Sequence, residues 1–169
     1  MVDKKQIIKE KVDYQGIFNF KDFYKYAHQF FKNENYDAII EEKYEEKLAS
    51  PDERNIKIEW NAQKSISDYF KIRIDAKFEI TNMINVEVEI DGKRKKMNKG
   101  GISVEIKGTL IRDPESKWGV TPFYKFIREI YDKYIIPTRV TQQEEKVSSD
   151  VIAFKEHLKS FLEIYGKRD

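Results

Sequence analysis

The chain has 169 residues, a length that favours a single domain spanning residues 1–169. Its 32 lysine and arginine residues nearly balance 30 aspartate and glutamate residues, which argues against a general nucleic-acid binder. Because the sequence has no cysteine and only two histidines, it excludes disulfides, thiolate metal sites, a cysteine nucleophile and a three-histidine metal site.

Apolar and polar residues alternate over several stretches, a period that is typical of strands with one buried and one solvated face. In the longest stretch, 70–80, every even position is apolar and every odd position is charged. The same pattern predicts strands over 8–18, 56–62, 86–90 and 102–110, a weaker strand over 38–48 and a short basic strand over 93–97. The continuous apolar runs of a parallel sheet are absent. We therefore predict an α+β fold with a one-sided antiparallel sheet of about six to seven strands.

Turn-forming residues separate these stretches. Ser67-Asp68 and Asp91-Gly92 suit tight hairpins, and the segment 98–101, with two adjacent glycines, suits a further turn. Asp113-Pro114 is expected to end the last strand, because proline cannot donate a hydrogen bond to a ladder.

Three stretches follow the helical period instead. The first runs from Phe20 to Phe31 behind Asn19, a favourable N-cap residue. The second runs from Phe123 to Tyr134 behind a threonine–proline pair, which is a common helix start.

The third helix is expected over 141–165, where Thr141 and Glu144 fit a capping box. Its apolar residues recur at intervals of four and three, which favours packing along the sheet and leaves a coiled coil as the alternative. Together with the sheet, this predicts about three helices, of which the C-terminal one is long.

This order of elements resembles the helix-grip fold of the START and Bet v 1-like superfamily, in which a curved sheet wraps a long C-terminal helix. The resemblance is topological and rests on no residue motif. It implies a binding module that holds an apolar ligand between sheet and helix. Separately, the segments YFKIRI, VEVEIDGKRKKMNKG and YDKYIIPTR resemble those of small uncharacterised archaeal proteins, and that similarity implies no activity.

Motifs of catalytic and nucleotide sites are absent, including G-x-G-x-x-G, the phosphate loop and G-x-S-x-G. A Ser–His–Asp triad would need His28 or His157, and both lie at helical spacing among charged neighbours, so we expect surface or boundary positions. The acidic run 41–46 suggests a cation site, but carboxylates on a strand alternate between its faces, which favours a solvated edge. Glu87 and Glu89 are not expected to form a catalytic pair without a recessed pocket.

The basic hairpin around the predicted turn at 91–92, with its cations at 93–99, is the sharpest local asymmetry of charge in the sequence. It is a candidate site for phosphates of nucleic acid or anionic lipid, and a solubilising, guarded sheet edge is the alternative. No aromatic residue lies among its cations, so base stacking is not expected. The candidate polyanion-binding residues are Lys93, Arg94, Lys95, Lys96 and Lys99.

We therefore predict a non-enzymatic binding domain without a metal or cofactor, in the cytoplasm because no stretch resembles a membrane span or signal peptide. The first hypothesis is an apolar or amphipathic small ligand between the sheet and the last helix. The alternatives are a structural or adaptor protein with a solid core and a macromolecular partner, and an enzyme that uses Tyr, Glu or Lys in the same cavity. The candidate cavity residues are Trp60, Phe70, Ile72, Phe78, Ile106, Phe154 and Phe161.

Overall fold

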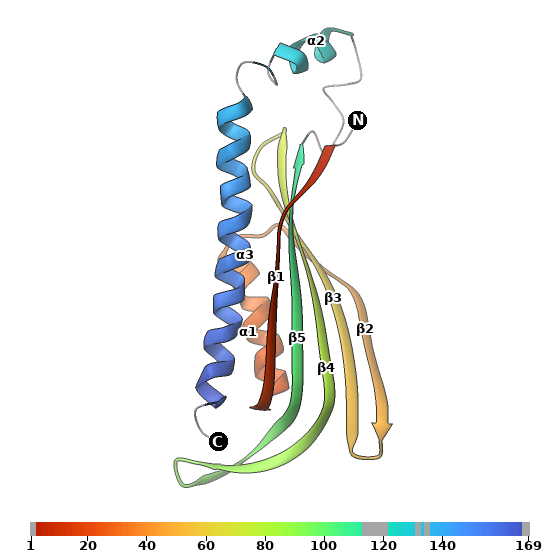
Figure 1. Cartoon of the computed structure of the whole chain (residues 1–169), viewed down its shortest axis with the longest axis vertical. Coiled ribbons are helices and arrows are strands. Elements are labelled where there is room, and N and C mark those ends of the chain that lie inside the picture. Colours follow the sequence, from red (N-terminus) through yellow and green to blue (C-terminus); the bar gives the residue numbers. More distant parts are fainter. Residues whose placement is uncertain (1–2, 113–121, 131–132, 134–135, 167–169) are drawn as a thin grey trace.

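The structure is a computed structural model that describes residues 3–112, 122–130, 133 and 136–166. This part of the chain consists of one antiparallel sheet of five strands and three helices (Figure 1). The α+β class and the one-sided sheet agree with the alternating sequence pattern. In chain order the elements are β1 (Asp3–Phe18), α1 (Phe20–Asn33), β2 (Ala38–Ser50), β3 (Glu53–Ser65), β4 (Phe70–Ile90), β5 (Lys93–Arg112), α2 (Pro122–Ile130) and α3 (Ile136–Gly166).

The sheet has the strand order β1-β5-β4-β3-β2, so β1 and β2 are its edges. Its five strands are fewer than the six to seven predicted, because β4 and β5 each continue through a segment where the sequence suggested a break. The register of this pair shifts once, between Thr81 and Ile84, where Asn82 has a φ of 52°. A β-bulge therefore replaces the expected strand end.

The adjacent glycines serve this bulge and do not form the turn predicted over 98–101, which lies inside β5. A Cβ atom added to Gly100 would lie 2.8 Å from the Thr81 carbonyl oxygen, so only glycine lets the bulged strand approach this closely. The turn at Asp91 and Gly92 is as predicted, since both residues have positive φ, as a primed two-residue hairpin requires.

Helices α1 and α3 cover one face of the sheet, and α2 lies beyond one end of it (Figure 1). The Asn19 side chain accepts a hydrogen bond from the Asp22 amide at 3.0 Å, which confirms it as the N-cap of α1. Helix α3 begins at Ile136, before the predicted capping box, because a proline is tolerated in the first turn of a helix. Thr121 and Tyr134, at the two ends of the predicted second helix, lie outside the described residues.

The core lies between the sheet and these helices. Helix α3 packs along β1 and β5, as the spacing of its apolar residues favoured over a coiled coil. Its approach depends on Gly108, where an added Cβ atom would lie 2.6 Å from Val147 Cγ1 and 2.8 Å from Val151 Cγ2. Within the described ranges, no helix combines the length and apolar character needed to cross a bilayer.

Candidate binding surfaces

The predicted cavity residues lie together in the described core, where they pack against one another. Phe161 packs against this cluster while half-buried, and the other six are at most 3% exposed. The ring of Phe31 on α1 lies 4.7 Å from that of Phe154, and the ring of Trp60 lies 4.8 Å from that of Phe78, measured between centroids. Aromatic side chains therefore interlock across the space where a ligand was predicted.

A gap between α1 and the sheet in the described core is too narrow to admit a water molecule. Pockets for small ligands commonly span about 300–1,000 Å³. The gap is lined by Phe20, Phe23, Tyr24, Ile58, Trp60, Phe78 and Ile80. A ligand of fatty-acid size would have to displace several of these side chains.

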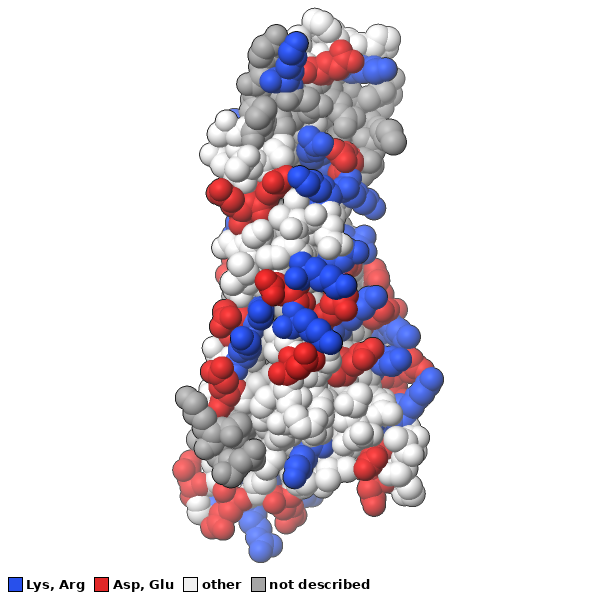
Figure 2. Space-filling view, viewed as in Figure 1, with Lys and Arg blue, Asp and Glu red and all other residues white. Residues whose placement is uncertain are grey.

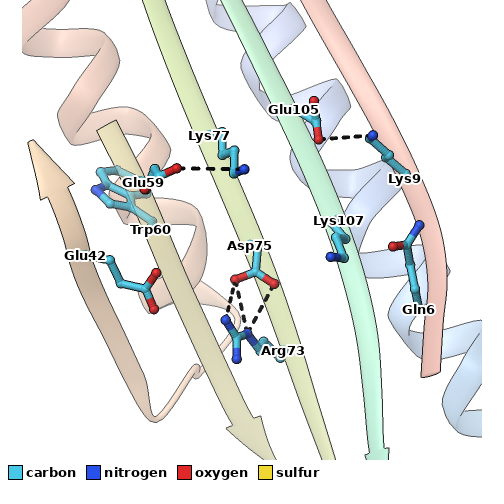
Figure 3. Close-up of a pocket in the computed structure, with 10 residues that line it drawn as sticks. All are labelled: Gln6, Lys9, Glu42, Glu59, Trp60, Arg73, Asp75, Lys77, Glu105 and Lys107. Carbon is cyan, nitrogen blue, oxygen red and sulfur yellow. Dashed lines mark hydrogen bonds and ion pairs between the residues drawn. The ribbon is translucent and has the colours of Figure 1, made fainter. Parts of the chain in front are cut away.

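A hollow of about 410 Å³ lies on the opposite, solvent-facing side of the sheet (Figure 3). It is lined by Gln6, Lys9, Glu42, Glu59, Trp60, Arg73, Asp75, Lys77, Glu105 and Lys107. The basic and acidic residues of this lining are equal in number, and most of them are already paired. The pairs are Arg73–Asp75 at 2.9 Å, Lys9–Glu105 at 3.2 Å and Lys77–Glu59 at 3.8 Å. The hollow therefore offers little net charge to an ionic ligand.

The same balance is seen on the face of the molecule that Figure 2 shows. In Figure 2, basic and acidic side chains are interspersed over the visible face, and neither sign forms a continuous field. Of the described lysines in the hollow, Lys107 alone has no ion pair, and its neighbours across the strands are Lys9 on β1 and Asp75 on β4. A single unpaired lysine on an open sheet face is an ordinary solvated residue.

The β4–β5 ribbon, residues 84–99, extends the hairpin past the ends of its neighbouring strands. The last partner of β5 on β1 is Phe18, opposite Asn98, and the last partner of β4 on β3 is Arg54, opposite Met83. Between residues 84 and 97 the ribbon thus consists of two strands only, with both edges free of strand partners in the described part of the chain, whereas Asn98 and Lys99 still pair with β1.

The register divides the predicted polyanion-binding residues between the two faces of the ribbon. Arg94 lies opposite Glu89, and Lys96 lies opposite Glu87, so the cations on this face, the paired face, are matched by acids. An ion pair also runs diagonally across this face, from Arg94 to Glu87 at 3.9 Å. The positive charge that the sequence places here is therefore largely compensated.

The other face of the ribbon, the cationic face, has no acidic residue. Here Lys93, Lys95 and Lys99 lie opposite Ile90, Val88 and Ile84, and Met97 lies opposite Val86. The four β-branched residues are half-buried, whereas the three lysines are exposed. Lysine stems cover apolar surface readily while the ammonium group stays in water. This face is both cationic and apolar.

A buried polar cluster joins the end of α1 to α3. The Tyr36 hydroxyl donates to Asp150 Oδ2 at 2.8 Å, and Lys146 Nζ donates to Asp150 Oδ1 at 2.9 Å. Burial, followed by the Asp150 carboxylate, raises the pKa of Tyr36, and the hydrogen bond to Asp150 raises the pKa of Lys146. With every buried side-chain polar atom in the described residues satisfied, the cluster fixes α3 and leaves no atom free for a ligand.

The histidines occupy structural positions. The ring of His157 stacks on Tyr26 with centroids 3.8 Å apart, and its Nε2–H donates to the Tyr26 carbonyl oxygen at 2.9 Å. His28 lies edge-on to Trp60, and burial lowers its pKa. Neither ring has a serine partner among the contacts of the described residues.

The carboxylates of the acidic run on β2 do not converge on a common point. Glu41 accepts hydrogen bonds from Tyr24 at 2.7 Å and from Trp60 Nε1 at 3.2 Å, whereas Glu42 accepts one from Asn61 at 3.0 Å. The carboxylates therefore diverge, and no group of three metal-ligating side chains is present in the described ranges.

In comparisons with known proteins, no family model matches this chain, and no curated protein is significantly similar to it. The ribbon and the edge strand β2 are thus interpreted from their own chemistry. Sequence reasoning located the cations of the ribbon but missed how they divide between faces. The sequence contains the signal, because a two-residue turn at 91–92 fixes the register of the hairpin, and alternate residues of each strand then lie on opposite faces.

Proposed function

We propose that this protein is a non-enzymatic binding module with a solid core, and that the cationic face of the ribbon binds an anionic lipid surface. The observation that carries the proposal is the segregation of charge on the ribbon. Lys93, Lys95 and Lys99 share a face without acids, whereas the acids of the facing strand lie opposite the other cations.

The apolar residues of this face favour lipid over nucleic acid. Binding of single strands relies on aromatic side chains that stack on bases, and the ribbon has none. A lipid surface accepts both features of the cationic face, since lysines pair with anionic headgroups and β-branched side chains enter the boundary with the acyl chains.

The predicted apolar ligand between sheet and helix stays a hypothesis with less support. Its candidate residues already pack against one another, and the remaining gap is smaller than an ordinary ligand pocket. A solid core favours a function on the surface of the molecule.

The test is sedimentation of the protein with vesicles that contain about 30% phosphatidylserine, with pure phosphatidylcholine vesicles for comparison, at about 0.15 M salt. Each basic residue near an anionic membrane contributes about 1 kcal/mol, so Lys93→Gln with Lys95→Gln should weaken binding by about 30-fold. Arg94→Gln with Lys96→Gln is the matched control, because it removes the same charge from the paired face and should weaken binding only a few-fold.

Three outcomes would overturn the proposal. These are no sedimentation with anionic vesicles, equal losses in the two double variants, and tighter binding to RNA than to vesicles at the same salt. Equal losses would mean that net charge, and not the cationic face, decides the binding.

A further inference from the structure

Strand β2 is an edge strand that exposes apolar side chains. Ile40, Tyr44 and Leu48 are 49%, 47% and 71% exposed, and they are the exposed large apolar residues of the described sheet; the others lie on α2 and α3. An edge strand also offers unpaired backbone donors and acceptors to another strand. These two features together indicate an interaction surface.

The regular part of β2 has two distinct faces. Its register with β3 is uninterrupted from Lys43 opposite Glu59 to Leu48 opposite Arg54. Tyr44, Glu46 and Leu48 share the core-facing side with Ile56 and Ile58, while Lys43, Glu45 and Lys47 point to the solvent side.

We propose that β2 pairs with β2 of a second copy of this chain, antiparallel and with the two-fold axis at Glu46, so that the two sheets become continuous. In an antiparallel pair, residues that lie opposite each other share a face. A symmetric pair can therefore be centred on any residue of β2, and each choice brings different side chains together.

Centring on Glu46 places Tyr44 opposite Leu48 of the second copy, and Glu45 opposite its Lys47, twice by symmetry. Centring on Glu45 would oppose glutamate to glutamate and Lys43 to Lys47, and centring on Lys47 would oppose lysine to lysine. Directly opposed like charges destabilise a pair of strands, whereas opposite charges and apolar pairs stabilise it.

The one like pair in this register is Glu46 with its own copy. Each Glu46 carboxylate already has a cation of its own chain, because Arg54 Nη1 lies 3.2 Å from Glu46 Oε1. The repulsion at the axis is thus compensated within each copy. Centring on Tyr44 would also pair Lys43 with Glu45, but its longer contacts would run through the bulge between Glu41 and Lys43.

This inference is independent of lipid binding, because the ribbon and β2 lie in different parts of the sheet and the oligomeric state is measured without vesicles. The first experiment is sedimentation equilibrium of the full chain. We expect a dimer, and Leu48→Lys should raise its dissociation constant at least tenfold. Ile164→Lys on α3, which also replaces an exposed apolar residue by lysine, should leave the constant unchanged. A monomer at about 100 μM, or equal dimerisation of Leu48→Lys, would overturn the proposal.

A charge exchange tests the register if Leu48→Lys fails to fold. Lys47→Glu should weaken the dimer by opposing glutamates, and the double variant Glu45→Lys with Lys47→Glu should restore it. Failure of the double variant to exceed the single variant would overturn the pairing of these positions.

Single cysteines locate the axis, because the natural chain has none. Directly opposed residues have Cα atoms about 4.5–5.5 Å apart, within the range that a disulfide requires. Glu46→Cys should therefore form a linked dimer under mild oxidation, and Lys43→Cys, whose copies would be separated by several residues along the strands, should not. Linkage through Tyr44→Cys in place of Glu46→Cys would overturn the proposed axis.

Discussion

The two edge strands of the sheet, β1 and β2, have opposite surroundings. Helix α3 lies along β1, and the two are joined by Lys5–Glu144 at 3.0 Å and Lys155–Glu10 at 3.1 Å. Among the described elements, no helix lies along the outer half of β2, where Leu48 is largely exposed. One edge is thus covered within the chain, and the other exposes apolar side chains.

The contrast suggests that one side of the sheet mainly stabilises the fold and that the other mainly presents a surface. The side of the sheet that includes β1 and β5 supports α3 and carries much of the core that holds the fold together. The β2 side carries apolar side chains that contribute little to that core. Substitutions of residues under α3 should therefore lower the free energy of unfolding strongly and change association little. Substitutions on β2 should weaken association strongly and change the free energy of unfolding little.

The largest expected effect is the loss of the Phe154 side chain, which lies on α3 and is fully buried. Phe154→Ala should lower the free energy of unfolding by about 3–5 kcal/mol, from lost burial and the cavity left behind. Leu48→Ala, measured below the concentration at which the chain associates, should cost under about 0.5 kcal/mol. Urea unfolding followed by circular dichroism measures both. Similar losses would show that the two sides of the sheet do not differ as described.

The sequence predicted the buried face of the sheet well, because the alternation over 70–80 is local and its period is that of a strand. It missed the continuity of β4 and β5 because a bulge with Asn82 and adjacent glycines has the composition of a turn. The contact of Tyr36 with Asp150 spans 114 residues, and no local pattern indicates it. The spacing of apolar residues on α3 correctly predicts that this helix packs along the sheet. It does not predict how closely the aromatic side chains of the core pack against α3, because that depends on the geometry of side chains that are distant in sequence.

A smaller effect is expected where α3 touches β5. Gly108→Ala would place a methyl group against Val147 and Val151, whose branched side chains have few alternative rotamers. Overpacking of this kind costs about 1–3 kcal/mol. Gly101→Ala is the comparison on the same strand, because its added methyl meets Gln15 and Thr81, whose side chains are exposed on the solvent side and not packed under a helix, so a smaller loss is expected. Equal stability of the two variants in urea unfolding would show that α3 adjusts its distance to the sheet.

The smallest effect concerns the contact between α1 and β2. The Tyr24 hydroxyl donates to Glu41, and burial, followed by this hydrogen bond, raises the pKa of Tyr24 to about 12 from its ordinary value of 10.0. The folded state therefore retains the proton when the unfolded chain has already lost it. The stability that Tyr24 contributes should be complete below about pH 10 and should decline as the pH rises towards 12.

Tyr24→Phe separates this contribution from that of other tyrosines. At pH 8 the variant should be less stable by about 1 kcal/mol, the usual worth of one hydrogen bond. As the pH rises from about 10 to about 12, the advantage of the wild type should disappear, because burial and the hydrogen bond to Glu41 both oppose the ionisation of Tyr24, whereas phenylalanine has no proton to lose. Urea unfolding at several pH values in this window, at a protein concentration that keeps the chain monomeric, gives the difference directly. If the difference in free energy of unfolding between wild type and Tyr24→Phe stayed constant up to pH 12, the hydrogen bond from the Tyr24 hydroxyl to Glu41 would not stabilise the contact between α1 and β2.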